Sequence, residues 1–147
     1  MFKHLLVTLD GSARAESVIP HAIDIGRSMG AKVTLLRIVD GTTSGWGERG
    51  AIGKSVEAPT GSLHVEQAKS YLDRVAEQIR ASGVTAHSVV KQGAPAKQIV
   101  ATAREADADA IVMATHSRRG LNRVMFGSVA EAVLHESHLP ILLVRVS

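Results

Sequence analysis

The sequence predicts an α/β fold, with an open, five-stranded, mostly parallel sheet covered by helices on both faces. Three observations predict it. Short apolar runs alternate with longer segments of helical spacing along all 147 residues. The short runs are continuously apolar and rich in β-branched residues, as in parallel strands that are buried on both faces. No internal repeat or composition shift marks a boundary, so we expect residues 1–147 to form a single domain.

Five runs are predicted to be strands: residues 4–9, 32–39, 87–91, 110–115 and 141–146. The last run, ILLVRV, follows Pro140 and ends almost at the end of the chain, so we expect it at an edge of the sheet. A bare apolar edge can pair with another chain, and a lysine at Leu143 would be expected to weaken such pairing.

Four segments are predicted to be helices. The first begins near Ser12, and Pro20 should kink it or break it near Ile19. The second begins with Ser62 as its N-cap and stops at Gly83.

Pro95 opens the third helix, in a position where a first turn accepts proline, and the fourth helix covers residues 128–136. Residues 41–62 lack apolar periodicity and contain six of the thirteen glycines, so they are predicted to form a flexible loop. Such a loop is either a disordered insertion or a functional lid.

The composition excludes several classes of function. There is no cysteine, so disulfides and thiolate metal sites are absent. The net charge of +3 and the four aromatic residues do not indicate nucleic-acid binding. No apolar run approaches the roughly 20 residues of a membrane span, and the N-terminus lacks a signal-peptide layout. We therefore expect a cytoplasmic protein that neither binds nucleic acid nor inserts into a membrane.

Open parallel sheets bind ligands beyond the carboxyl ends of their strands, where the strand order reverses. Three strand ends carry polar or small residues: LDGS at 9–12, IVD at 38–40 and ATHS at 114–117. The third leads through Arg118 and Arg119 to Gly127-Ser128 at the start of a helix. A helix N-terminus preceded by glycine readily binds phosphate, although the same pair also occurs as a simple turn with an N-cap.

The chain resembles the universal stress protein family, the UspA-like domains. The resemblance covers LLVTLDGSARAE, LLRIVD, GAPAKQIVATAREADADAIVMATHS and GSVAEAVLHESHLPILLVRV. It implies a Rossmann-like fold of the adenine nucleotide alpha hydrolase-like type. The ATP-binding branch of the family has a G-x2-G-x9-G-S/T pattern. This chain keeps the spacing from Ala114 through Ser117 to Gly127-Ser128, with the first two glycines replaced.

The resemblance implies an ATP site built from three strand ends. The backbone of Ile38 would contact adenine, and Asp10 with Thr8 would lie near the ribose or the metal-bound phosphates. The remaining implied residues follow the fourth strand and start the last helix: Met113, Ala114, Thr115, His116, Ser117, Arg118, Arg119, Gly120, Gly127, Ser128 and Val129.

The same residues limit the chemistry that we expect. No GxxxxGK[ST] loop is present, and there is no SGGxDS loop after the first strand, as an adenylating ATP pyrophosphatase should have. His116 has no partner at a recognisable spacing, so it is interpreted as a structural residue of the loop. We therefore expect at most a weak ATPase without catalytic residues. No metal-ligand spacing occurs, so Mg²⁺ or Mn²⁺ would come with the phosphates.

Two functions remain open from the sequence. One is an ATP-binding regulator in the stress response, a homodimer through its C-terminal strand that acts on a protein partner. The other is a dimeric stress adaptor that binds no nucleotide and acts through protein contacts. The replacements at Ala114 and Ser117 are the main support for the second.

Overall fold

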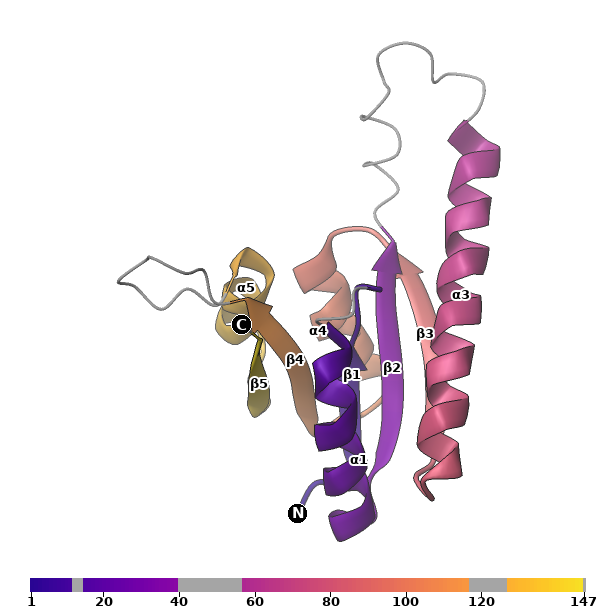
Figure 1. Cartoon of the computed structure of the whole chain (residues 1–147). Helices are drawn as coiled ribbons and strands as arrows, with labels where there is room; N and C mark the ends of the chain where they lie inside the picture. Colours follow the sequence, from indigo (N-terminus) through magenta and orange to yellow (C-terminus); the bar gives the residue numbers. More distant parts are fainter. Residues whose placement is uncertain (12–14, 40–56, 117–126, 147) are drawn as a thin grey trace.

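The computed structural model describes residues 1–11, 15–39, 57–116 and 127–146. Five strands form one sheet in the order β3-β2-β1-β4-β5, and every neighbouring pair is parallel (Figure 1). Their bounds are β1 (His4–Thr8), β2 (Lys32–Val39), β3 (Ala86–Gln92), β4 (Ala110–His116) and β5 (Ile141–Val146). The predicted strands, their parallel arrangement and the edge position of the last strand are confirmed.

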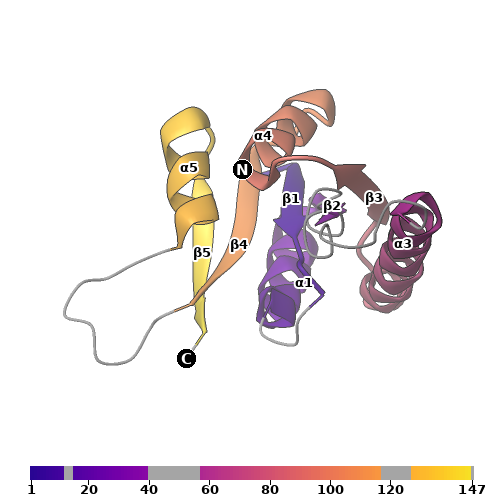
Figure 2. The ribbon, with the colours of Figure 1, turned by 90° about the horizontal axis from the view of Figure 1, so that it is seen from above.

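Helices cover both faces of this sheet, as predicted. A 3-10 helix, η1 (Ala15–Ser17), leads into α1 (Val18–Met29), and the others are α3 (Glu57–Ala81), α4 (Pro95–Glu105) and α5 (Ser128–Glu136). Figure 2 shows α4 and α5 on one side of the sheet and α1 and α3 on the other. Alternate residues of β1 point to opposite faces of the sheet. Leu5 and Val7 pack with α1 and α3, and Leu6 packs with α4 and α5. No helix in the described ranges is both long and apolar enough to cross a bilayer.

The start of the first helix differs from the prediction. Among the described residues, helical structure starts at Ala15 as a 3-10 helix. The α-helix begins at Val18 and is not broken at Ile19. Pro20 therefore lies in the first turn of α1. An N–H there has no intrahelical partner, so proline removes no hydrogen bond and needs no kink. Ser12 lies outside the described residues.

The second predicted helix also begins earlier than expected. Helix α3 starts at Glu57, so Ser62 is not its N-cap, and residues 57–62 belong to a helix rather than to a loop. Pro59 again falls in a first turn, where proline is tolerated. The rest of the predicted loop, residues 41–56, lies outside the described residues. The C-terminal stop is confirmed, because α3 ends at Ala81 and Gly83 has a φ of +93°.

The register shows that β1 is shorter than its neighbours at the carboxyl edge. Its ladder with β2 ends at Thr8↔Leu36, where the N–H of Leu9 donates to the Leu36 carbonyl at 2.9 Å. Beyond this point β2 continues to Val39 and β4 continues to His116. A notch is therefore left above the end of β1, between the ends of β2 and β4.

A buried polar pair lies at the opposite edge of the sheet. His4 is 7% exposed, and its Nε2 lies 2.7 Å from the Thr34 hydroxyl across the β1–β2 ladder. Burial, and then the charge of Lys32, hold the pKa of His4 below its ordinary value. The folded chain therefore favours the neutral imidazole at this position.

This pair predicts a loss of stability in mild acid. In the unfolded chain His4 takes up a proton as the pH falls through about 6.5, whereas the folded chain resists protonation until a lower pH. The free energy of unfolding should therefore fall below pH 6.5, and in His4→Gln this fall should be smaller. Urea denaturation between pH 7 and pH 5 measures it. His21→Gln, at an exposed position of α1, is the control and should keep the wild-type pH slope. Equal slopes in wild type and His4→Gln would contradict this account of His4.

Candidate functional site

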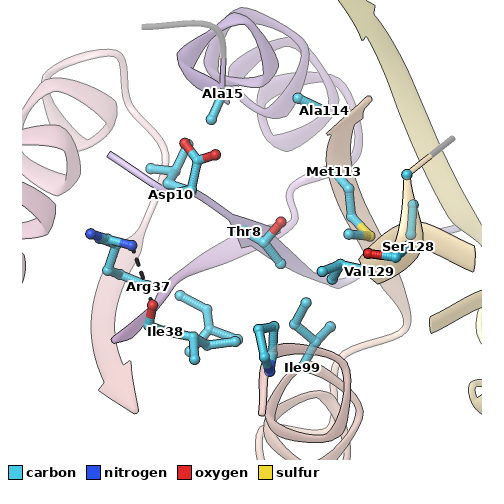
Figure 3. Close-up of a pocket in the computed structure, with 15 residues that line it drawn as sticks. Thr8, Asp10, Ala15, Arg37, Ile38, Ile99, Met113, Ala114, Ser128 and Val129 are labelled. Carbon is cyan, nitrogen blue, oxygen red and sulfur yellow. Dashed lines mark hydrogen bonds between the residues drawn. The ribbon is translucent and has the colours of Figure 1, made fainter. Parts of the chain in front are cut away.

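A pocket of about 390 Å³ fills the notch above β1, at the point where the strand order reverses. This volume lies within the range of small-molecule sites. Figure 3 shows Arg37 and Ile38 on one side of the pocket, Met113, Ser128 and Val129 on the opposite side, and Thr8 between them. The lining residues are Thr8, Leu9, Asp10, Ala15, Leu36, Arg37, Ile38, Pro95, Ile99, Met113, Ala114, Gly127, Ser128, Val129 and Ala130.

Most of this lining is apolar. The α4–α5 side supplies Leu36, Ile99 and Met113, which belong to the buried core of that face. Asp10 and Arg37 are the charged side chains among the described lining residues. The pocket therefore has apolar walls with few charges, an arrangement that suits a flat, weakly polar group with an ionic substituent.

The carboxyl end of β2 gives the pocket a backbone acceptor. The Val39 carbonyl accepts a hydrogen bond from the N–H of Gly93, on the β3 side of β2, at 3.3 Å. Backbone groups of successive residues in a strand point to opposite sides, so the Ile38 carbonyl faces away from β3 and toward the pocket. Because β1 has already ended, none of the described strands covers this position of β2 on the pocket side.

Arg37 reaches this acceptor. Its Nη1 donates to the Ile38 carbonyl at 3.2 Å. Gly11 brings the chain close to the same guanidinium, since a Cβ added at Gly11 would lie 3.6 Å from Arg37 Nε. Gly11 has a φ of +89°, a left-handed conformation that glycine adopts without strain.

A hydrogen bond ties the pocket to the longest helix. The Tyr71 hydroxyl of α3 donates to Glu16 Oε2 of η1 at 2.7 Å. Burial raises the pKa of Tyr71, and the hydrogen bond to Glu16 and the nearby charges of Glu16 and Asp10 raise it further. The phenol therefore stays protonated and keeps donating. This contact holds η1, whose Ala15 lines the pocket, against α3.

The opposite wall is the N-terminus of α5. Gly127 precedes the helix with φ +95° and ψ 150°, and no side chain of the described residues caps the helix start. The first intrahelical bond runs from the N–H of Glu131 to the Gly127 carbonyl at 3.0 Å. The N–H groups of residues 128–130 therefore lack intrahelical partners, and all three of these residues line the pocket. The positive end of the helix dipole faces the cavity.

The structure brings together many of the residues that the sequence predicted. Those that line the pocket are Thr8, Asp10, Ile38, Met113, Ala114, Gly127, Ser128 and Val129. Thr115 is buried in β4 and does not line it. His116 is the last residue of β4, but its side chain lies outside the described part of the chain. Ser117, Arg118, Arg119 and Gly120 also lie outside the described residues.

Other lining residues were missed by the sequence reasoning: Leu9, Ala15, Leu36, Arg37, Pro95, Ile99 and Ala130. A signal existed for Arg37, which is a charged residue inside the apolar run LLRIV of a buried strand. Pro95 and Ile99 belong to the first turns of α4, which begins just after β3 ends at the same edge of the sheet. Apolar periodicity assigns these residues to the core and does not distinguish core from pocket wall.

Comparison with known proteins identifies the family. The model of the universal stress protein family matches residues 1–145. The chain belongs to this family. Universal stress protein MJ0531 of Methanocaldococcus jannaschii is 31% identical to the chain, over 99% of the chain and 83% of the relative.

Solved structures of the family share the fold. The structure of MJ0577, from the same organism, superposes with a TM-score of 0.82 at 25% identity, over 100% of this chain and 98% of that one. An Archaeoglobus fulgidus universal stress protein was solved with dAMP (TM-score 0.64, 23% identity, 97% of each chain). Another universal stress protein was solved with cAMP (TM-score 0.67, 20% identity, 99% of this chain and 98% of that one). Some members of the family therefore bind adenine nucleotides.

Ala114, which replaces the first glycine of the ATP-binding pattern, causes no backbone strain. Among the described residues that are not glycine, Asp107 alone has a positive φ, so Ala114 keeps ordinary strand geometry at the end of β4. Its methyl group lies at the pocket wall, half-buried. A glycine at residue 114 is therefore not required by the backbone.

Gly127 is required by the backbone. The combination of φ +95° and ψ 150° is essentially restricted to glycine, although a Cβ there would meet no atom within 4 Å. Gly127→Ala should therefore lower the free energy of unfolding by about 1–3 kcal/mol through strain alone. Ser128→Ala, at the next residue, is the matched control and should change it by less than about 0.5 kcal/mol. Urea denaturation measures both, and equal stabilities of the two variants would refute the strain.

Proposed function

We propose that this universal stress protein binds an adenine nucleotide, ATP, in the pocket above β1, and acts as a nucleotide-dependent regulator. The proposal rests on one observation: two walls with different hydrogen-bonding groups line the same pocket. One wall offers a backbone acceptor at Ile38, and the other offers the N–H groups at the start of α5. A nucleotide needs both, because its base and its phosphates make different contacts at its two ends.

The apolar side chains of the pocket suit the base. Ile38 of β2 and Ile99 of α4 lie near one another (Figure 3), and Pro95 of α4 also lines the pocket, so a purine ring can pack against these side chains. Adenine can also donate its exocyclic amino group to the Ile38 carbonyl. The family resemblance assigns adenine to the backbone of the same residue, and the dAMP and cAMP complexes of related proteins support this class of ligand.

The N-terminus of α5 suits the phosphates. The N–H groups of residues 128–130 and the Ser128 hydroxyl would donate to phosphate oxygens. Mg²⁺ or Mn²⁺ would arrive with the phosphates, because among the described residues no group of three metal-ligating side chains occurs. Arg118 and Arg119, outside the described part, remain proposed phosphate partners together with Ser117 and Gly120.

Hydrolysis of ATP at this site would be slow at most. Among the described lining residues, Asp10 is the one carboxylate, and no histidine or lysine lines the pocket. Fast phosphoryl transfer needs a positioned base or water-orienting residue together with compensating positive charge. We therefore propose a regulator that reports the presence of nucleotide to a protein partner in the cytoplasm.

The replacement Ser128→Asp separates phosphate binding from folding. An aspartate at the first position of α5 favours the helix through its dipole but repels phosphate from the same N–H groups. With Mg-ATP at about 100 times its Kd, the wild type should gain about 2.7 kcal/mol of stability, measured as a rise in Tm. Ser128→Asp should fold normally and lose this rise.

The control for this test is Ser70→Asp, at an exposed position of α3 that does not line the pocket. It adds the same charge and should respond to Mg-ATP as the wild type does. An unchanged wild-type Tm with Mg-ATP, and no adenine nucleotide in native mass spectra of the purified protein, would reject nucleotide binding and favour the adaptor function. A full Tm rise in Ser128→Asp would reject only the phosphate site.

We also propose that the protein is a homodimer through β5. This strand lies at the edge of the sheet, and α5 covers only one of its faces (Figure 2). Leu142 is 40% exposed, whereas Leu143 is partly buried against the core beneath α4 and α5. A change at Leu143 would therefore disturb folding as well as association, so Leu142 is the better position for a test.

Leu142→Lys should shift the protein from dimer to monomer, because a buried lysine at an interface loses hydration without a partner. Light scattering after size exclusion measures the mass. Leu134→Lys is the control, since Leu134 is a leucine of similar exposure, 44%, on α5 rather than on the edge strand. A wild-type monomer, or an unchanged dimer in Leu142→Lys, would contradict the assignment of β5 as the interface.

A further inference from the structure

Met113 brings a sulfur atom to the wall of the pocket. The ladder between β1 and β4 ends at Val112, so Met113 is the first residue of β4 beyond it. Its side chain belongs to the apolar cluster beneath α4 and α5, packs there with Val129, and lines the cavity. It is 5% exposed. The side chain is therefore shielded from bulk water but borders the space that a ligand would fill.

This thioether is the redox-sensitive group of the pocket. The sequence has four methionines and no cysteine, so methionine supplies all of its sulfur. Met1 and Met29 are 91% and 41% exposed, and neither lines the pocket. Met125 lies outside the described residues. Among the described methionines, Met113 alone places sulfur at the proposed ligand site.

A hydroperoxide oxidises such a thioether to a sulfoxide. A sulfur lone pair attacks one peroxide oxygen, the S–O bond forms as the O–O bond breaks, and hydrogen peroxide leaves as water. The sulfur loses two electrons and the peroxide gains two. A cavity of about 390 Å³ admits a molecule as small as hydrogen peroxide. The product is a polar side chain in place of a flexible apolar one.

The new oxygen would enter beside free hydrogen-bond donors. In Figure 3 the sulfur of Met113 is directed toward Ser128 and Val129, at the start of α5. The N–H groups of residues 128–130 have no intrahelical partner, and Ser128 adds a hydroxyl. A sulfoxide oxygen among apolar side chains needs a partner, so it would accept from these donors. They are the same donors that we propose for the phosphates.

We propose that Met113 is an oxidation site for hydroperoxides and that its sulfoxide closes the phosphate end of the pocket to nucleotide. The inference rests on the proposed nucleotide-binding function. It makes binding sensitive to peroxide, and it makes a bound nucleotide the shield of Met113, because the ligand fills the cavity through which peroxide arrives.

The test begins with the pattern of oxidation. Met125 is replaced by leucine in every protein compared, so that its oxidation does not contribute, and Met125→Leu is the parent. The parent is treated with hydrogen peroxide without and with saturating Mg-ATP, and peptide mass spectrometry quantifies each sulfoxide. Met113 should be oxidised without nucleotide and protected by it. Met29 is the internal control and should be oxidised equally in both samples, since it does not line the pocket.

Isothermal titration then gives the Kd for Mg-ATP before and after peroxide. In the parent it should rise by about ten- to a hundredfold, the effect of losing hydrogen bonds to a charged group. Adding Met113→Leu, a replacement of similar volume, should leave a ratio near one, whatever the starting Kd. Adding Met29→Leu is the matched control and should keep the ratio of the parent.

The outcomes separate this inference from the function on which it rests. If Met29 is oxidised while Met113 stays reduced without nucleotide, Met113 is not an oxidation site. If Met113 is oxidised but the Kd is unchanged, or rises as much in Met113→Leu, its sulfoxide does not close the pocket. Either result overturns the inference and leaves nucleotide binding intact. If the untreated wild type does not bind Mg-ATP, nucleotide binding itself fails, and the inference fails with it.

Discussion

The early end of β1 is the constraint on which the functional part of this fold depends. The hydrogen bond from the Leu9 N–H to the Leu36 carbonyl is the last one between β1 and β2, and the chain then turns away through Gly11. Both neighbouring strands continue, so the backbone at Ile38 faces a space that none of the strands in the described ranges fills. The N-terminus of α5 closes the other side of that space. A longer β1 would complete the sheet and remove the pocket.

The sequence was sufficient to predict the sheet because buried parallel strands leave a strong signal. The apolar runs of β1, β2, β4 and β5 are nearly continuous, whereas β3, at the other edge of the sheet, carries several polar residues. Each strand is separated from the next by a segment of helical period. The errors concern helix starts, and both involve proline. Pro20 and Pro59 were interpreted as interior breakers or loop residues, yet each is the third residue of its helix. Proline is compatible with a first turn and not with an interior, and sequence alone does not give the start from which to count.

The site was predictable where a motif or a strand end marks it, as at Asp10 and at Gly127-Ser128. Arg37 was missed because its role depends on register. Only the relative lengths of β1 and β2 show that its side chain can pass the end of one strand and reach the backbone of the other. Ile99 and Pro95 were missed for a related reason: the period of a helix gives its apolar face, but not which turn of that face reaches the cavity. Residues 117–126 carry several predicted contacts and lie outside the described residues, so those contacts remain predictions.

The position of the pocket also links ligand binding to the β1–β4 seam of the sheet, which has the shortest strand ladder. Pairing between β1 and β4 runs only from Leu5↔Ala110 to Val7↔Val112, the shortest ladder of the four. This ladder joins β1, β2 and β3 to β4 and β5, and the pocket lies directly beyond its end.

A nucleotide that contacts Ile38 on one side and α5 on the other would bridge both parts of the sheet where the backbone does not. Binding energy would then tighten the seam itself, because a ligand stabilises the arrangement that it contacts. Among the described strands β5 pairs with β4 alone, so a change in this seam would shift the edge strand relative to β1, β2 and β3. That is a physical route by which a bound nucleotide could alter the surface that a partner chain contacts.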